Sequence, residues 1–141
     1  MDYQTAVRVS AGFGGGMYLG SVCGAVTGGI MAIGLKHGGL GPTSMQTAIL
    51  VRDFADRFKA QHRSINCPDL TGFDLGKIDL RNPETLKKIF GNLSTPEGQK
   101  ATREMLGGRD PKELFAACQS YVKDAATIVS EIVSGPAKGT P

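Results

Sequence analysis

The sequence is poor in the residues that most often mark a metal or catalytic site. Its 141 residues contain two histidines, three cysteines and no tryptophan. Cys23, Cys67 and Cys118 lie far apart, and no Cys-x-x-Cys pair occurs. The spacing of a thioredoxin-like motif or a zinc ribbon is therefore absent. With two histidines and no supporting motif, Ser/His/Asp hydrolysis is disfavoured.

A signal peptide is also missing, because the start, MDYQTAVRVSAG, lacks a basic region followed by an apolar run. Together with the odd number of cysteines, this argues against a disulfide framework. The net charge of +3 is small and no lysine/arginine cluster forms, which argues against a nucleic-acid partner. We therefore expect reduced thiols in a cytoplasmic protein.

The composition is typical of a globular chain, with 40% hydrophobic and 21% charged residues. No strand-like alternation and no internal repeat occur. We expect an all-α fold, a small helical bundle with a buried glycine-rich helix and a long irregular loop. Residues 1–133 are expected to form one domain, followed by a flexible tail at 134–141.

Glycines, prolines and capping residues predict where the helices begin and end. Ser21 is the expected N-cap of the glycine-rich helix. Asn82, Thr95 and Asp110 each precede a proline, which favours a helix start. The expected helices are 2–11, 21–35, 43–62, 82–91, 95–107 and 110–133, and the expected loop is 64–82. Aspartates in that loop are expected to form turns and caps rather than a calcium site.

The stretch GFGGGMYLGSVCGAVTGGIMAIGL, residues 12–35, allows three interpretations. No residue from Val9 to Leu35 is charged, a length that could span a membrane. Its first half is broken by glycines, however, and the continuous apolar part, 22–35, is too short. A dinucleotide site is disfavoured because Met17 occupies the last glycine position of G-x-G-x-x-G and no strand precedes it. The turn could still bind an anion through backbone N–H groups.

The third interpretation is a buried helix that holds a thiol. A helix from 21 to 35 is apolar nearly all round, which is typical of a buried helix. Cys23 is expected in its first turn, where the helix N-terminus favours a thiolate. The small residues let neighbouring backbones approach closely. The glycines indicate either a site that needs room or tight helix packing alone.

Three stretches carry a family resemblance: the glycine-rich segment with VCGAVTG, then INCPDLTGFDL, then CQSYVKDAATIVSEI. They resemble the C-GCAxxG-C-C family of redox-active proteins, over nearly the whole chain. A related domain occurs in split-Soret cytochrome c, where it is associated with an iron–sulfur or other iron centre. The resemblance implies that Cys23, Cys67 and Cys118 form the redox or metal site.

Two departures limit that site. The family's first cysteine lies on an additional helix upstream of SAGFGGG, and many relatives have cysteine where this chain has Phe73. At most three thiolates per chain are then available for an iron–sulfur cluster or another transition metal. His37 or His62 could supply a further ligand, although a histidine at a helix end more often interacts with the helix dipole. The glycines expected to line the pocket are Gly14, Gly15, Gly16, Gly24 and Gly28.

Two functions from different classes follow. In the first, the three cysteines meet and serve electron transfer or thiol redox chemistry with a redox partner protein. No acid/base pair favours substrate turnover. In the second, each cysteine is a small buried hydrophobe and the protein is a non-catalytic helical module for oligomerisation or partner binding. Loss of the upstream helix would expose apolar faces, so a homo-oligomer, most simply a dimer, is expected.

Overall fold

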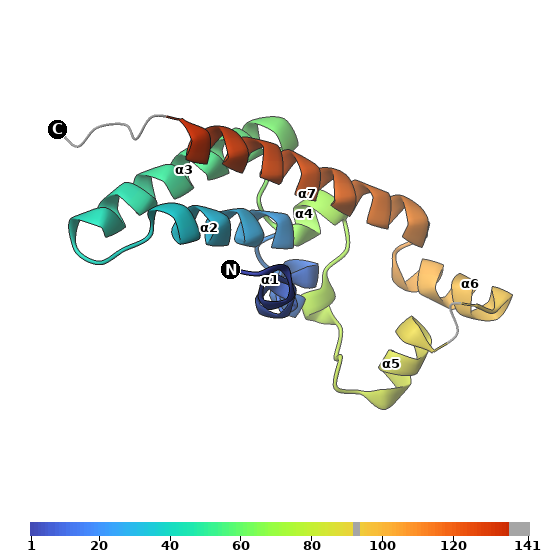
Figure 1. The fold of residues 1–141 in the computed structure, drawn as a ribbon. Helices are drawn as coiled ribbons and strands as arrows, with labels where there is room; N and C mark the ends of the chain where they lie inside the picture. Colours follow the sequence, from blue (N-terminus) through green and yellow to red (C-terminus); the bar gives the residue numbers. More distant parts are fainter. Residues whose placement is uncertain (92–93, 136–141) are drawn as a thin grey trace.

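The computed structural model describes residues 1–91 and 94–135 (Figure 1). The helices are α1 (Tyr3–Ser10), α2 (Gly24–His37), α3 (Pro42–His62), α4 (Cys67–Thr71), α5 (Pro83–Phe90), α6 (Pro96–Met105) and α7 (Pro111–Ser134). A π-helical segment, η1 (Gly16–Gly20), and a 3-10 turn, η2 (Leu75–Lys77), complete the described elements. The expected all-α fold is confirmed. Residues 136–141, most of the expected tail, lie outside the described residues.

The predicted capping signals operate at the starts of α5, α6 and α7. The side chains of Asn82, Thr95 and Asp110 accept hydrogen bonds from backbone N–H groups of the first turns. A proline follows each of these residues, where the missing N–H costs nothing and the fixed φ suits a helix. These local rules explain why three helix starts were predictable from sequence.

One expected helix boundary is wrong, and one expected loop is only partly irregular. The glycine-rich helix α2 is not capped by Ser21 but begins at Gly24, after Cys23. The carbonyl of Ser21 instead accepts a hydrogen bond of 2.8 Å from the N–H of Cys67, and this pairing keeps the chain extended there. The expected loop 64–82 is also not wholly irregular, because it contains α4 and η2.

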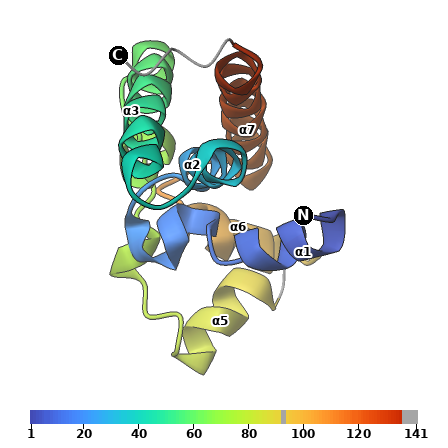
Figure 2. The ribbon, with the colours of Figure 1, turned by 60° about the vertical axis from the view of Figure 1, so that its left-hand side comes forward.

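The core lies between α2, α3 and α7, which run side by side (Figures 1 and 2). Its buried side chains are Cys23, Val26, Ile33, Phe54, Phe58, Ala125, Ile128, Val129 and Ile132. Gly29 of α2 is buried directly against Phe54, where an added Cβ would lie 2.4 Å from the ring. The opposite side of α2 faces outward, and Leu35 there is 61% exposed.

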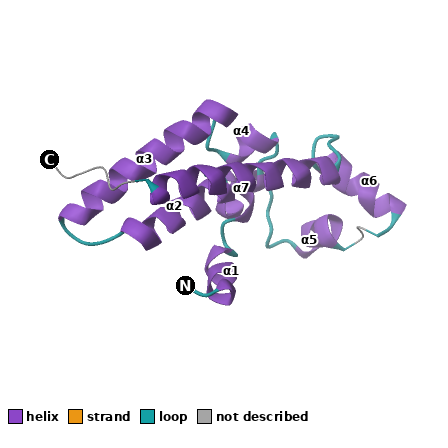
Figure 3. Cartoon of the chain, turned by 45° about the horizontal axis from the view of Figure 1, so that its top comes forward, coloured by secondary structure: helices purple, strands orange, loops and turns teal. Residues whose placement is uncertain are grey.

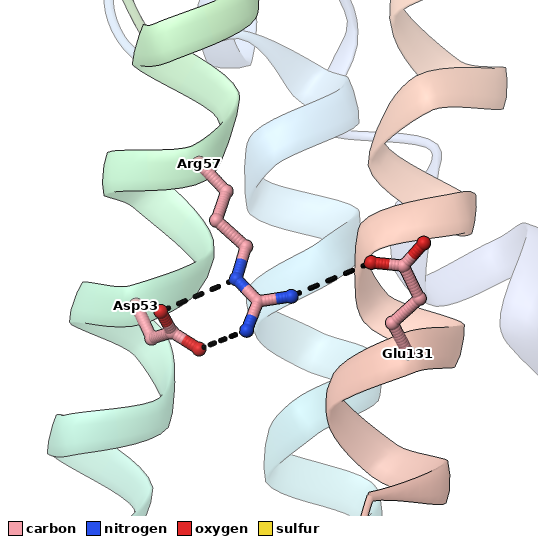
Figure 4. A network of polar contacts seen from close by, with 3 residues as sticks. All are labelled: Asp53, Arg57 and Glu131. Atoms are coloured by element: carbon pink, nitrogen blue, oxygen red, sulfur yellow. Dashed lines mark hydrogen bonds and ion pairs between the residues drawn. The ribbon is translucent and has the colours of Figure 1, made fainter.

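A polar network connects α3 to α7 at the surface (Figure 4). The guanidinium of Arg57 contacts Asp53, one turn earlier on α3, through Nη2 at 2.9 Å and Nε at 3.2 Å. Its Nη1 lies 3.4 Å from Glu131 of α7. All three side chains are substantially exposed, so the network adds little stability.

Two parts of the chain lie away from this core (Figures 1 and 3). Helices α5 and α6 lie between α4 and α7 in the chain, pack against each other and extend away from the core. On another side, α1 contributes no buried residue. Across the described residues, no helix combines the length and the apolar character needed to cross a membrane.

The glycine-rich turn between α1 and α2 folds back tightly on itself. Gly16 has a φ of +67°, and a Cβ there would lie 2.4 Å from the backbone nitrogen of Ser21. Gly24, at the start of α2, faces the carbonyl oxygen of Phe13, which would lie 2.6 Å from an added Cβ. Only glycine permits these approaches. They bring the turn against the first residue of α2, beside Cys23.

Candidate functional site

A two-residue bridge brings Cys23 and Cys67 together. The N–H of Cys23 donates to the carbonyl of Ile65, and the N–H of Cys67 donates to the carbonyl of Ser21, both at 2.8 Å. These bonds flank the antiparallel pair of Val22 and Asn66. Since side chains alternate across such a pairing, Cys23 and Cys67 lie on the same side as diagonal neighbours. Their Cα atoms are then about 7–8 Å apart.

Cys118 approaches the same region from α7. It lies one turn before Tyr121, so the two side chains share a face of the helix. The hydroxyl of Tyr121 donates to the carbonyl of Leu70 in α4, the helix that begins at Cys67, at 2.9 Å. This contact holds the face that carries Cys118 against α4. Three cysteines from distant parts of the sequence thus occupy one neighbourhood.

The electrostatics of the thiols reflect this proximity. Burial raises the pKa of Cys67; a hydrogen bond with the Thr71 hydroxyl opposes the rise, and the charges of Cys23 and Asp74 add to it. Burial also raises the pKa of Cys118, and the Cys23 and Cys67 thiolates raise it further. Each thiolate that forms therefore makes the next one harder to form.

Thr71 and Arg109 support the site, and sequence reasoning did not find them. Thr71 is buried, and its hydroxyl oxygen lies 2.7 Å from the Cys67 carbonyl and 3.9 Å from the Cys67 sulfur. The same oxygen accepts the N–H of Phe73 at 3.2 Å. Arg109 donates to the carbonyl of Thr71. The i,i+4 spacing of Cys67 and Thr71 was the available signal, because it places both side chains on one face of a short helix.

Cys23 occupies the N-cap position of α2, and no side chain caps the helix there. The unpaired N–H groups of a helix start carry partial positive charge, which stabilises a nearby anion such as a thiolate. Cys23 is 8% exposed, so this field is weakly screened. Cys23 is also the most deeply buried of the three cysteines.

The five expected pocket glycines differ in their surroundings. Gly15, Gly16 and Gly24 are in close contact with neighbouring groups, so a side chain there would collide with them. A Cβ on Gly14 would make only ordinary contact with Tyr18, and one on Gly28 would meet nothing within 4 Å. Of these five glycines, Gly24 is the one that directly follows a cysteine, Cys23.

Neither histidine joins the thiols. His37 ends α2, 14 residues after Cys23, which corresponds to about 20 Å along the helix. His62 packs against Phe58 and Tyr121, with ring centroids 4.6 Å and 4.9 Å away. Its Nε2 lies 3.1 Å from a carboxylate oxygen of Asp124 but is not aligned for a hydrogen bond. Its ring neighbours are thus aromatic side chains and not thiols.

Residues that bind one metal ion must have suitable ligand atoms and must lie close together. Thiolates are suitable ligands for iron, zinc or copper(I). In the part of the chain described, however, no group of three or more histidine, cysteine or acidic side chains lies close enough to hold an ion. The ligands are of the right chemistry, but as they are arranged among the described residues they show no metal site.

Comparison with known proteins identifies the family to which the chain belongs. A family model described as "Putative redox-active protein (C_GCAxxG_C_C)" matches residues 1–132. The chain belongs to this family. The match spans all three cysteines and the core helices, which confirms the resemblance carried by the glycine-rich segment. The description names redox activity and no metal, cluster or partner. No curated protein and no solved structure matches the chain.

Proposed function

We propose that the protein performs thiol–disulfide redox chemistry with Cys23 and Cys67 as the working pair. The bridge at Val22 and Asn66 carries this proposal, because it fixes both cysteines on one side of two paired segments. A disulfide needs Cα atoms roughly 4.4–6.8 Å apart, against about 7–8 Å for diagonal neighbours. A shift of about 1–2 Å would close the bond. Membership of a family described as redox-active supports the same conclusion.

The reaction is a two-step exchange with an acceptor disulfide. The Cys23 thiolate, at the start of α2, attacks one acceptor sulfur, forms a mixed disulfide and releases one acceptor thiol. The Cys67 thiolate then attacks the Cys23 sulfur and releases the second. In total the pair loses two electrons and two protons, and the acceptor disulfide gains both. A redox partner protein in a reducing compartment such as the cytoplasm would reverse the reaction.

Cys118 is assigned as an auxiliary thiol. Its pKa is raised by burial and by both other thiolates, which disfavours attack by Cys118 itself. Replacing Cys118 should therefore leave the Cys23–Cys67 pair functional. Replacing Cys67 should instead arrest the reaction at the mixed disulfide on Cys23.

A transition metal or iron–sulfur cluster held by Cys23, Cys67 and Cys118 is the second candidate. It is favoured by the mutual repulsion of the three thiolates, which a bound cation would relieve. Binding would require the sulfurs to approach one another, since their present spacing does not suit an ion.

One preparation separates these functions. The protein is purified anaerobically, its metal content and visible spectrum are recorded, and it is then equilibrated with reduced and oxidised glutathione. Alkylation and peptide mass spectrometry should find one Cys23–Cys67 disulfide, retained in Cys118→Ser and replaced by a glutathione adduct on Cys23 in Cys67→Ser. Stoichiometric iron with a visible band would support the metal candidate instead. Metal-free protein whose thiols stay reduced throughout would support the non-catalytic module and refute both.

A further inference from the structure

The chain exposes more surface than a compact monomer of its size. Its accessible area is 9454 Å², whereas a folded monomer of 14.8 kDa exposes about 7,000 Å². The excess is about 2,500 Å². Obligate homodimers bury roughly 1,000–2,500 Å² per subunit. The excess therefore spans the whole range of area that such an interface buries per subunit.

The outer face of α2 is one apolar part of this surface. Gly28, Met31 and Leu35 lie one turn apart on the side opposite the buried Val26 and Ile33. Leu35 is 61% exposed, and space is open at Gly28. No charged residue occurs in α2 before Lys36. A helix that is apolar on all sides is normally covered on all sides, whereas the described residues leave Met31 only partly buried and Leu35 exposed on this face.

Helix α1 also has apolar side chains that the rest of the chain does not bury. It has eight residues and none is buried, although Tyr3 and Val7, one turn apart, expose 78% and 46% of their surface. Isolated helices of this length are not stable in water, and burial of an apolar face usually supplies the missing stability. Figure 1 shows α1 below the N-terminal end of α2, while the rest of α2 extends beyond it. The apolar faces of α1 and α2 are therefore both incompletely covered among the described residues.

We propose that a second copy of this chain covers both faces, so that α1 of each protomer packs on the outer face of α2 of its partner. In such a two-fold dimer both contacts form twice, and each protomer covers the faces that the other leaves open. Opposite charges, Asp2 and Arg8, flank the apolar residues of α1, and the α2 face is uncharged, so no like-charge repulsion opposes the contact.

Sedimentation equilibrium and light scattering on the full chain test the proposal. Wild-type protein at about 10 µM should have about twice the monomer mass of 14.8 kDa. Leu35→Glu and Tyr3→Glu each disrupt one side of the contact. Because each acts at both copies, either should weaken dimerisation at least about 100-fold. Val122→Glu is the matched control: Val122 is 57% exposed on α7, a helix that takes no part in the proposed contact, and its substitution should leave the dimer intact.

Hydrogen exchange distinguishes a variant that has lost the dimer contact from one that has simply unfolded. In the dimer the amides of residues 3–10 should be protected, and in Leu35→Glu they should exchange at rates close to those of an unstructured chain while α3 and α7 stay protected. A monomeric wild type, or a dimer that persists in both Leu35→Glu and Tyr3→Glu, would overturn the proposal. A Val122→Glu variant that dissociates as readily would place the interface elsewhere and overturn it too.

Discussion

Two glycines of α2, five residues apart, should respond in opposite ways to the same substitution. Gly29 is buried against Phe54, and a Cβ there would lie 2.4, 2.9 and 3.0 Å from three atoms of the ring. Gly34 has nothing within 4 Å of the same position. Both lie inside the helix, so Gly29→Ala and Gly34→Ala gain a similar helix propensity of about 0.5–1 kcal/mol.

The expected difference follows from packing. Phe54 is fully buried in the core, so its ring has no open space into which it could move. Overpacking of this kind costs about 1–3 kcal/mol. After the gain in propensity, Gly29→Ala should lower the free energy of unfolding by about 1–2 kcal/mol, and Gly34→Ala should raise it by about 0.5–1 kcal/mol. Because the gain in propensity is common to both, the two variants should differ by the overpacking cost, about 1–3 kcal/mol.

Urea unfolding followed by circular dichroism measures this difference directly. The midpoints should fall on opposite sides of wild type with unchanged slopes, which shows that stability and not compactness has changed. The thermal midpoints should separate by about 5–10 °C for a chain of this length. If Gly29→Ala proved as stable as Gly34→Ala, the packing of Phe54 against α2 would be wrong.

Three further predictions concern the site and its frame. Thr71→Val removes the acceptor of the Phe73 N–H and the hydrogen bond to the Cys67 sulfur. It should cost about 1–2 kcal/mol of stability and raise the pKa of Cys67, seen as slower alkylation at fixed pH; unchanged alkylation would remove Thr71 from the site. Cys23→Ser should lower the pKa of Cys67 and Cys118, shifting their alkylation profiles to lower pH, and an unshifted profile would show that Cys23 lies farther away. Arg57→Met should change urea stability by less than about 1 kcal/mol, because the ion pairs of Arg57 are exposed; a larger loss would contradict this weak role.

Alkaline pH should also destabilise the fold, and the sign follows from the same two thiols. Folding raises the pKa of Cys67 and Cys118, so the folded state retains their protons when the unfolded chain has lost them. Their contribution is complete below the ordinary thiol pKa of about 8.5 and is lost as the pH rises through the raised values. Urea midpoints that stay constant from neutral to strongly alkaline pH in wild type would contradict the burial of these thiols.

The sequence predicted what local rules determine. Asn82, Thr95 and Asp110 are capping residues followed by proline, and such signals act within a few residues of the helix start. The apolar stripe of α7 was predicted by its helical period and includes the buried Ala125 and Ile128. Both features depend on neighbours in the chain and therefore need no knowledge of the fold.

What was missed depends on contacts between distant segments. Ser21 has the chemistry of an N-cap, yet its carbonyl pairs with the Cys67 N–H, and this long-range bond moves the helix start to Gly24. The same pairing sets the spacing of Cys23 and Cys67. A single antiparallel bridge has no periodic pattern that could be recognised in sequence.

The glycine-rich stretch was ambiguous because its glycines meet different physical demands. Gly16 and Gly24 admit backbone atoms, and Gly29 admits an aromatic ring. At Gly28 and Gly34, no described atom lies within 4 Å of an added Cβ. A membrane span, a phosphate loop and a tightly packed helix each explain part of such a composition. The surroundings of each position separate these roles: the first glycines shape the turn beside Cys23, Gly29 joins α2 to the core, and Gly28 leaves open the face assigned here to a second copy of the chain.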